Sequence, residues 1–212
     1  MARIIAFTGR AGCGKSTARD LLVENYDMVS ASFAGALRLM LVPLLLVEAE
    51  GDPEIVDDYL YANKQKHIHT MGMSTREALQ RVGGLFREHN PDVFVQTLDH
   101  QLKNYAKIMA QLPEEFGTDP IFVIDDLRYD NEAAYLQNHH QSTIVRIARP
   151  EEHLAKVPEH HSESGIDREF IDVVITNDAD LLSYRQKILS LGEMYDLPIK
   201  GIDNSKETAR VH

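Results

Sequence analysis

A glycine-rich segment near the N-terminus has residue types and spacing that suit phosphate binding. Residues 9–16 read Gly-Arg-Ala-Gly-Cys-Gly-Lys-Ser and match the pattern G-x-x-x-x-G-K-[ST]. Glycines let a backbone wrap closely, so that its N–H groups point at phosphate oxygens. Lys15 supplies a charge that can follow the β- and γ-phosphates, and the Ser16 hydroxyl can bind Mg²⁺. We call residues 9–17 the glycine loop and predict that it binds a nucleoside triphosphate.

The alternative for this loop is a chance glycine-rich turn. Its position argues against chance, because an apolar run that predicts a strand precedes it and a predicted helix follows it. The positive end of that helix would be directed at the phosphates. Cys13 is expected to be a small filler whose backbone matters, and not a nucleophile.

An acidic pair is the second candidate for chemistry. Asp125 and Asp126 follow the short apolar run 121–124, which predicts a strand. A carboxylate at the carboxyl end of a strand can hold Mg²⁺ directly or through water, and either aspartate can serve. The alternative is a helix cap or a surface turn. Arg128 can bind the phosphate under attack, or it can form a surface ion pair with Asp125, Asp126 or Glu132.

One face of a predicted helix carries groups that suit a nucleotide. This face carries residues separated by four, three and four positions: Arg76, Gln80, Gly83 and Arg87. Two guanidinium groups, an amide and a close-approach glycine fit a phosphate and a base edge. The alternative is a solvated face paired with neighbouring glutamates.

Histidine pairs raise the question of a zinc site. The pairs are His67/His69, His139/His140 and His160/His161. They have no cysteine partners, and they lack the i, i+4 spacing of helical zinc motifs. We expect them to be solvated polar residues, and those within 149–168 can touch phosphates.

Composition excludes several classes of function. The 212 residues carry a formal net charge of −11, which disfavours a nucleic-acid polymer as substrate. Cys13 is the only cysteine, so no intrachain disulfide can form and a reducing compartment fits. We expect no signal peptide, because residues 4–7 are too short an apolar run, and no membrane span, because residues 37–47 are too short and contain Arg38 and Pro43. The expected location is the cytoplasm.

Strands are predicted to alternate with helices along the chain. Apolar runs predict strands at residues 3–8, 28–33, 121–124, 143–147 and 170–176. Helices are predicted at residues 16–26, 34–48, 53–61, 74–89, 91–109, 131–138 and 179–195. The pattern indicates an α/β fold with a parallel sheet of about five strands and helices on both faces. No linker separates two independent domains, so a single domain is expected.

Seven motifs together resemble the bacteriophage deoxynucleoside monophosphate kinases. In chain order they are IAFTGRAGCGKST, SFAGALRLM, TREALQRVGGLFR, VIDDLRYDNEA, VRIARP, HHSE and ITNDADL, which spread over most of the chain up to Leu181. The resemblance implies a P-loop, adenylate-kinase-like fold of three α/β/α layers. Its parts would be a core (1–33, 120–148 and 170–196), an acceptor-binding region (34–112), a lid (149–168) and a tail (197–212).

The same resemblance implies transfer of the γ-phosphate of ATP to a deoxynucleoside monophosphate (dNMP), with Mg²⁺ as cofactor. It places ATP on the glycine loop (Gly9, Arg10, Gly12, Cys13, Gly14, Lys15, Ser16 and Thr17) and, on the adenine side, on Asn177 and Asp178. It places the acceptor on Arg38, Arg76, Gln80, Arg87 and Arg128, and the metal on Ser16 with Asp125 or Asp126. Lys15, Asp125 and Arg128 would be catalytic. The partners would be ATP and a dNMP, in the host cytoplasm if a phage encodes the chain, with a homodimer left open.

The sequence departs from the family pattern in two places. Gly35-Ala36 stands where the family often has Asp-Pro, which removes a polar group near the acceptor. The predicted lid carries few arginines, so the transferring phosphate would be neutralised by Arg149, Lys156, Arg168 or histidines such as His161. Two alternatives stay open: a kinase for another small acceptor, of the dephospho-CoA or phosphomevalonate type, and a nucleotide-binding switch without an acceptor.

Overall fold

The computed structural model describes residues 2–111, 120–154 and 165–200. The chain forms two compact units: Met1–Ala31 with Ala106–His212, here called the sheet unit, and Ser32–Tyr105, here called the helical unit. The helical unit overlaps most of the region 34–112 in which the family resemblance implies acceptor binding. Half of the predicted lid, including Lys156 and His161, and most of the predicted tail lie outside the described residues.

The sheet unit is built on five parallel strands, as the alternating pattern predicts. The strands are β1 (Arg3–Thr8), β2 (Val29–Ala31), β5 (Ile121–Ile124), β6 (Gln141–Ala148) and β7 (Val173–Thr176). Their order across the sheet is β2-β5-β1-β6-β7, and each neighbouring pair is parallel. Because β1 is central, its carboxyl end lies between the carboxyl ends of β5 and β6. Whatever follows these three strands is therefore brought together at one edge.

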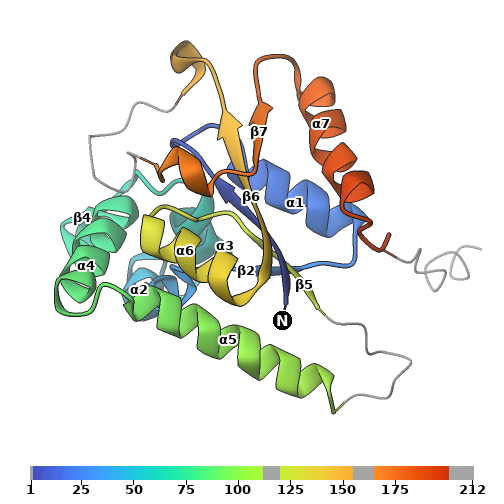
Figure 1. The fold of residues 1–212 in the computed structure, drawn as a ribbon. Coiled ribbons are helices and arrows are strands. Elements are labelled where there is room, and N and C mark those ends of the chain that lie inside the picture. The colour runs from blue at the N-terminus through green and yellow to red at the C-terminus, as the bar shows by residue number, and fades with distance from the viewer. Residues whose placement is uncertain (1, 112–119, 155–164, 201–212) are drawn as a thin grey trace, which may run out of the picture. The chain divides into compact units, whose positions relative to one another are not determined.

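Helices cover both faces of this sheet. Helices α1 (Lys15–Asn25) and α7 (Leu181–Met194) lie on one face, and α6 (Asp130–His139) lies on the other (Figure 1). Side chains alternate along each strand, so Ile5 and Phe7 face α1 and α7. The α/β architecture with a parallel sheet between helices is thus confirmed.

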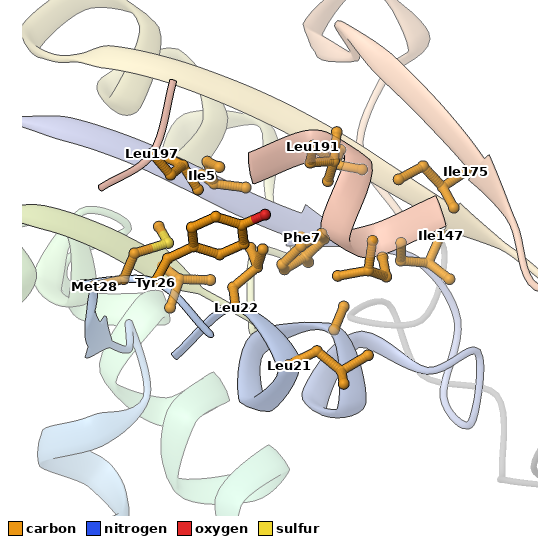
Figure 2. Packing of buried hydrophobic residues seen from close by; sticks show 14 of the residues in the cluster. Ile5, Phe7, Leu21, Leu22, Tyr26, Met28, Ile147, Ile175, Leu191 and Leu197 are labelled. Carbon is orange, nitrogen blue, oxygen red and sulfur yellow. The ribbon is translucent and has the colours of Figure 1, made fainter. Parts of the chain in front are cut away.

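The core under α1 and α7 is a continuous apolar cluster. Leu22, Tyr26, Tyr184 and Leu191 pack there, with relative exposures of 7% or less. Figure 2 shows Tyr26 among Ile5, Leu22 and Met28. The Tyr26 hydroxyl donates a hydrogen bond to Leu189 O at 2.9 Å, which satisfies its polar end in this apolar surrounding.

The helical unit contains three helices of more than ten residues: α2 (Gly35–Glu48), α4 (Thr75–His89) and the first part of α5 (Val93–Met109). Helix α4 begins with a capping box, in which Glu77 N–H donates to Ser74 Oγ and Ser74 N–H donates to Glu77 Oε2. On α5, the side chains of Phe94, Leu98 and Leu102 are spaced four residues apart and are buried.

Residues 51–74 contain the predicted helix and, after it, a short hairpin that was not predicted. Helix α3 (Pro53–Asp57) continues into the π-helix η1 (Asp58–Ala62), and β3 (His67–Ile68) pairs antiparallel with β4 (Met73–Ser74) across the short turn η2 (His69–Met71). Two-residue strands leave no period to detect in a sequence. The predicted strand at 170–176 is wrong in its first half, because Arg168–Phe170 form the 3-10 turn η6.

Across the described residues, every helix is too short or too polar to cross a membrane.

Candidate functional site

The glycine loop connects the carboxyl end of β1 to the start of α1. Gly9, Gly12 and Gly14 have φ angles of 138°, 78° and 111°, which other residues rarely adopt. A Cβ on Gly9 would lie 2.5 Å from Ile147 O and 2.9 Å from Cys13 Sγ. The loop therefore needs glycine at these three positions for its backbone angles, and at Gly9 also for its close approach to β6.

Lys15 turns its side chain back across the loop. Its ammonium donates to Gly9 O at 2.6 Å and to Arg10 O at 2.9 Å, and Cys13 Sγ lies 3.7 Å away. The side chain is buried, although Ser16 and Thr17 beside it are exposed. The loop thus holds a buried positive charge at the place where the sequence predicts a phosphate contact.

The first acid of the pair meets the glycine loop directly. Asp125 follows β5, and its Oδ2 accepts hydrogen bonds from Ser16 Oγ at 2.8 Å and from Arg19 Nη1 at 3.0 Å. Asp125 is 7% exposed, so this ion pair is mostly shielded from water. Burial lowers the pKa of Arg19, but Asp125 and Asp20 together raise it above its ordinary value. The predicted meeting of Ser16 and Asp125 follows from the neighbouring positions of β1 and β5.

Glu132 holds the turn that follows the acid pair. It is 1% exposed, and its Oε2 accepts from the backbone N–H groups of Arg128 at 3.0 Å and Tyr129 at 3.2 Å. Asp126 is buried at 6% exposure, and the Arg128 side chain is half-buried. The Glu132 carboxylate thus fixes the backbone between β5 and α6, and with it the position of the Arg128 Cα atom from which that side chain extends.

Three side chains bind the outer side of the glycine loop. Arg149 Nη1 donates to Gly12 O at 2.9 Å, Asn177 Nδ2 donates to Cys13 O at 2.9 Å, and the Tyr184 hydroxyl donates to Gly14 O at 2.9 Å. Burial raises the pKa of Tyr184 far above its usual value. Arg149 and Asn177 were assigned to the lid and to the adenine side; in the structure they contact the loop backbone.

The turn after β7 is fixed by a lysine of α7. Lys187 Nζ donates to Thr176 O at 2.9 Å, to Thr176 Oγ1 at 3.0 Å and to Asp178 Oδ1 at 2.9 Å. Its hydrogen bond lowers the pKa of Asp178, which is exposed. Asn177 N–H also donates to Ala148 O at 2.7 Å. The predicted adenine-side residues thus sit on a turn with a defined shape.

The described ends of the predicted lid differ in their contacts. Glu151 pairs with Arg10 of the glycine loop at 3.1 Å, on the surface. Arg168 is exposed at the start of η6.

The predicted acceptor residues of the helical unit lie on α2 and α4. Arg38 donates to Ser32 Oγ at 2.7 Å, and its guanidinium lies 5.7 Å from the centre of the Tyr61 ring. The Arg87 guanidinium lies 4.3 Å from the centre of the Phe94 ring. Arg76 and Gln80 are half-buried and lie about three and two turns before Arg87 on α4.

Gly83, interpreted from the sequence as a close-approach glycine, lies against α2 in the structure. A Cβ there would lie 3.3 Å from Leu37 Cδ2 and 3.3 Å from Arg87 Nη1. The glycine therefore makes room for α2 and for the folded Arg87 side chain.

The donor set around Ser16 fits a small divalent cation. Mg²⁺ prefers oxygen ligands and is typically held by one or two carboxylates together with substrate phosphates. The Ser16 hydroxyl and the Asp125 carboxylate supply such oxygens 2.8 Å apart. Among the described residues, no group of three or more His, Cys, Asp or Glu side chains is placed to hold a metal ion.

Four residues of this site were not found from the sequence. Arg19 could have been found from its spacing, because it lies one turn after Lys15 and Ser16 on α1 and shares their face of the helix. From the sequence, Glu132 is named only as a possible ion-pair partner of Arg128, whereas in the structure it accepts hydrogen bonds from the backbone. Tyr184 and Lys187 were not found. Tyr184 reaches the glycine loop only through the packing of α7 against α1, and Lys187 contacts the turn after β7.

Two solved structures show a distant likeness. The protein TT1252 of Thermus thermophilus is 18% identical, with coverage of 92% of this chain and 97% of that chain and a TM-score of 0.48. A dephospho-CoA kinase from Campylobacter jejuni is 15% identical, with coverage of 91% and 97% and a TM-score of 0.46. These scores are too low to carry an inference about this chain.

Sequence comparison is more specific. A protein of Acanthamoeba polyphaga mimivirus, provisionally named a deoxynucleotide monophosphate kinase, is 24% identical over 198 residues, which cover 88% of this chain and 94% of the viral protein. The model of the deoxynucleotide monophosphate kinase family matches residues 54–188, well over half of the chain. This matched range contains Arg76, Asp125, Arg128 and Asn177. The chain belongs to the deoxynucleotide monophosphate kinase family.

Proposed function

We propose that this protein transfers the γ-phosphate of ATP to a deoxynucleoside monophosphate, giving ADP and a deoxynucleoside diphosphate. One observation carries the proposal: the Ser16 hydroxyl meets the Asp125 carboxylate beside the glycine loop, in a chain whose residues 54–188 match the kinase family. The glycine loop would hold the triphosphate, and Asn177 and Asp178 would lie on the adenine side.

The reaction needs positioning and charge neutralisation more than acid–base chemistry. An oxygen of the acceptor phosphate attacks the γ-phosphorus in line, and the bond from that phosphorus to the β,γ-bridging oxygen breaks as ADP leaves. The attacking oxygen already carries negative charge, so no strong base is required. Lys15 would exchange its bonds with Gly9 O and Arg10 O for bonds with the phosphates.

Ser16 and Asp125 would hold the Mg²⁺, with the adjacent Asp126 as a further carboxylate, and the ion would neutralise charge on the β- and γ-phosphates. Arg19 already neutralises Asp125, so binding of the ion requires Arg19 to share or release that carboxylate. Arg128 would bind the transferring phosphate, with its backbone held by Glu132.

We assign the acceptor to cationic and amide groups of the helical unit. Arg76, Gln80 and Arg87 share one face of α4, and Arg38 lies on α2. Guanidinium groups bind phosphate oxygens in a bidentate manner, and an amide can read a base edge. On an acidic chain of net charge −11, such a group of arginines is a local exception that suits an anionic acceptor.

An acceptor panel tests the proposal. ADP release would be measured by a coupled assay with ATP and Mg²⁺, alone and with dAMP, dCMP, dGMP, dTMP, dephospho-CoA or phosphomevalonate. At least one dNMP should raise the rate by about 10²-fold or more, because positioning the acceptor lowers the barrier. Equal rates with and without every acceptor would contradict a kinase, and a rise with dephospho-CoA or phosphomevalonate alone would reassign the acceptor.

A further inference from the structure

The outer side of the glycine loop is held by two side chains from the far end of the chain. Asn177 Nδ2 donates to Cys13 O and the Tyr184 hydroxyl donates to Gly14 O, both at 2.9 Å. We propose that Asn177 and Tyr184 are positioning residues for ATP, which orient the peptide planes of the glycine loop so that its N–H groups face the phosphates. We call the two residues the outer brace. This proposal rests on the proposed kinase function, since it takes the triphosphate to bind at this loop.

Because a peptide group is planar, a hydrogen bond that fixes its carbonyl oxygen also fixes the direction of its N–H group. In a trans peptide the C=O and the following N–H point in opposite directions, and the described peptide bonds are all trans. Cys13 O shares its plane with Gly14 N–H, and Gly14 O shares its plane with Lys15 N–H. Holding both oxygens outward therefore directs the two N–H groups to the inner side of the loop, where an anion would bind.

The outer brace is itself held rigidly. Tyr184 is 2% exposed within the core cluster under α1 and α7. Asn177 has its backbone N–H bonded to Ala148 O at 2.7 Å, and Lys187 fixes the residues on either side of it. Both donors therefore come from ordered elements, so they can impose a conformation on the loop.

The absence of a side chain at Gly14 is an independent sign of this arrangement. A Cβ there would lie 2.8 Å from Asn177 Nδ2 and 3.0 Å from the Tyr184 hydroxyl oxygen. Any other residue at this position would push the outer brace away from the carbonyls. Gly14 is thus required by the two donors as well as by its φ of 111°.

The bond from Tyr184 is additional to the bonds that form the helix. Gly14 O also accepts from Ala18 N–H at 3.0 Å, which is the first hydrogen bond of α1. Burial raises the pKa of Tyr184, so the phenol keeps the proton that it donates. Removing the hydroxyl should therefore leave α1 in place and loosen only the orientation of the loop peptides.

The test compares three variants of the full chain with the wild type. Tyr184→Phe and Asn177→Ala each remove one donor of the outer brace. Tyr135→Phe is the matched control, because it removes a tyrosine hydroxyl that contacts His140 Nε2 at 3.2 Å, away from the glycine loop. Calorimetry gives the Kd of a non-hydrolysable ATP analogue with Mg²⁺, and steady-state kinetics give KM for ATP, KM for the dNMP and kcat. Thermal unfolding reports stability.

Each outer-brace variant should raise the Kd of the analogue and the KM for ATP by about three- to tenfold, the effect of one lost hydrogen bond. KM for the dNMP should stay at the wild-type value. Tyr135→Phe should match the wild type in the Kd of the analogue and in both KM values. A purely structural role predicts a lower melting temperature with no separation of the two KM values.

Wild-type affinity for the analogue in both Tyr184→Phe and Asn177→Ala would overturn the proposal, as would an equal rise in both KM values. If the wild type binds the analogue and both variants bind it with the same Kd, the outer-brace proposal is wrong and the proposed kinase function stands. If the wild type does not bind the analogue, both proposals fall. Asn177→Ala changes a half-buried turn residue, so it gives the same readout should Tyr184→Phe not fold.

Discussion

Lys15→Ala should lower kcat/KM for phosphate transfer by about 10³-fold or more while the protein stays folded. Removing a preorganised group that neutralises transition-state charge typically costs two to several orders of magnitude. The folded state should tolerate the change, because the Lys15 ammonium bonds the loop carbonyls Gly9 O and Arg10 O, so its loss affects the glycine loop before it affects the core of the sheet unit. Arg10 O also keeps its hydrogen bond from Cys13 N–H at 3.3 Å.

The measurement is the coupled ADP assay with the best dNMP, together with thermal unfolding of both proteins. Lys103→Ala is a suitable control, because Lys103 pairs with Asp99 at 2.7 Å on the exposed side of α5. Surface pairs of this kind contribute at most about 1 kcal/mol, so the control should keep wild-type kinetics. A Lys15→Ala protein that turns over within about tenfold of the wild type would contradict the assigned role.

The largest expected effect on stability comes from Gly192→Ala. Gly192 lies in α7 against the buried Tyr26 ring, and a Cβ there would lie 2.0 Å from Tyr26 Cζ and 2.4 Å from Cε2. The ring cannot simply turn away, because it is packed in the core of Figure 2 and its hydroxyl bonds Leu189 O. We expect a loss of about 1–3 kcal/mol in the free energy of unfolding, the usual cost of overpacking.

Gly84→Ala is the matched control for this change. Gly84 also lies inside a helix, α4, but a Cβ there would have open space around it. Both substitutions gain the same helix propensity, about 0.5–1 kcal/mol, so their difference isolates the clash with Tyr26. Denaturant unfolding of the three proteins measures that difference. Equal stability of the two variants would mean that the Tyr26 ring does not fill this space.

The sequence predicts this fold well wherever a local period or a cap exists. The apolar run at residues 3–8 forms β1, and the helix predicted at 74–89 is found as α4, which begins after its Ser74 cap. The short strands β3 and β4 were missed, because two residues carry no pattern and their pairing is set by the packing of the helical unit.

The candidate site shows the same division. The proximity of Ser16 and Asp125 could be predicted from the sequence, because neighbouring parallel strands end at one edge of a sheet. Tyr184 could not, because its position depends on how α7 packs against α1, and no local spacing encodes that contact. Asn177 was found, but its bond to Cys13 O follows from the shape of a turn that only the structure reveals.

The central claim is that the glycine loop holds the triphosphate with its N–H groups and Lys15. A crystal structure of the protein with a non-hydrolysable ATP analogue and Mg²⁺ tests it most directly. We expect the phosphates against the backbone N–H groups of residues 12–16, with Lys15 Nζ moved from Gly9 O and Arg10 O onto phosphate oxygens. A triphosphate bound elsewhere, with Lys15 still on those two carbonyls, would contradict the account.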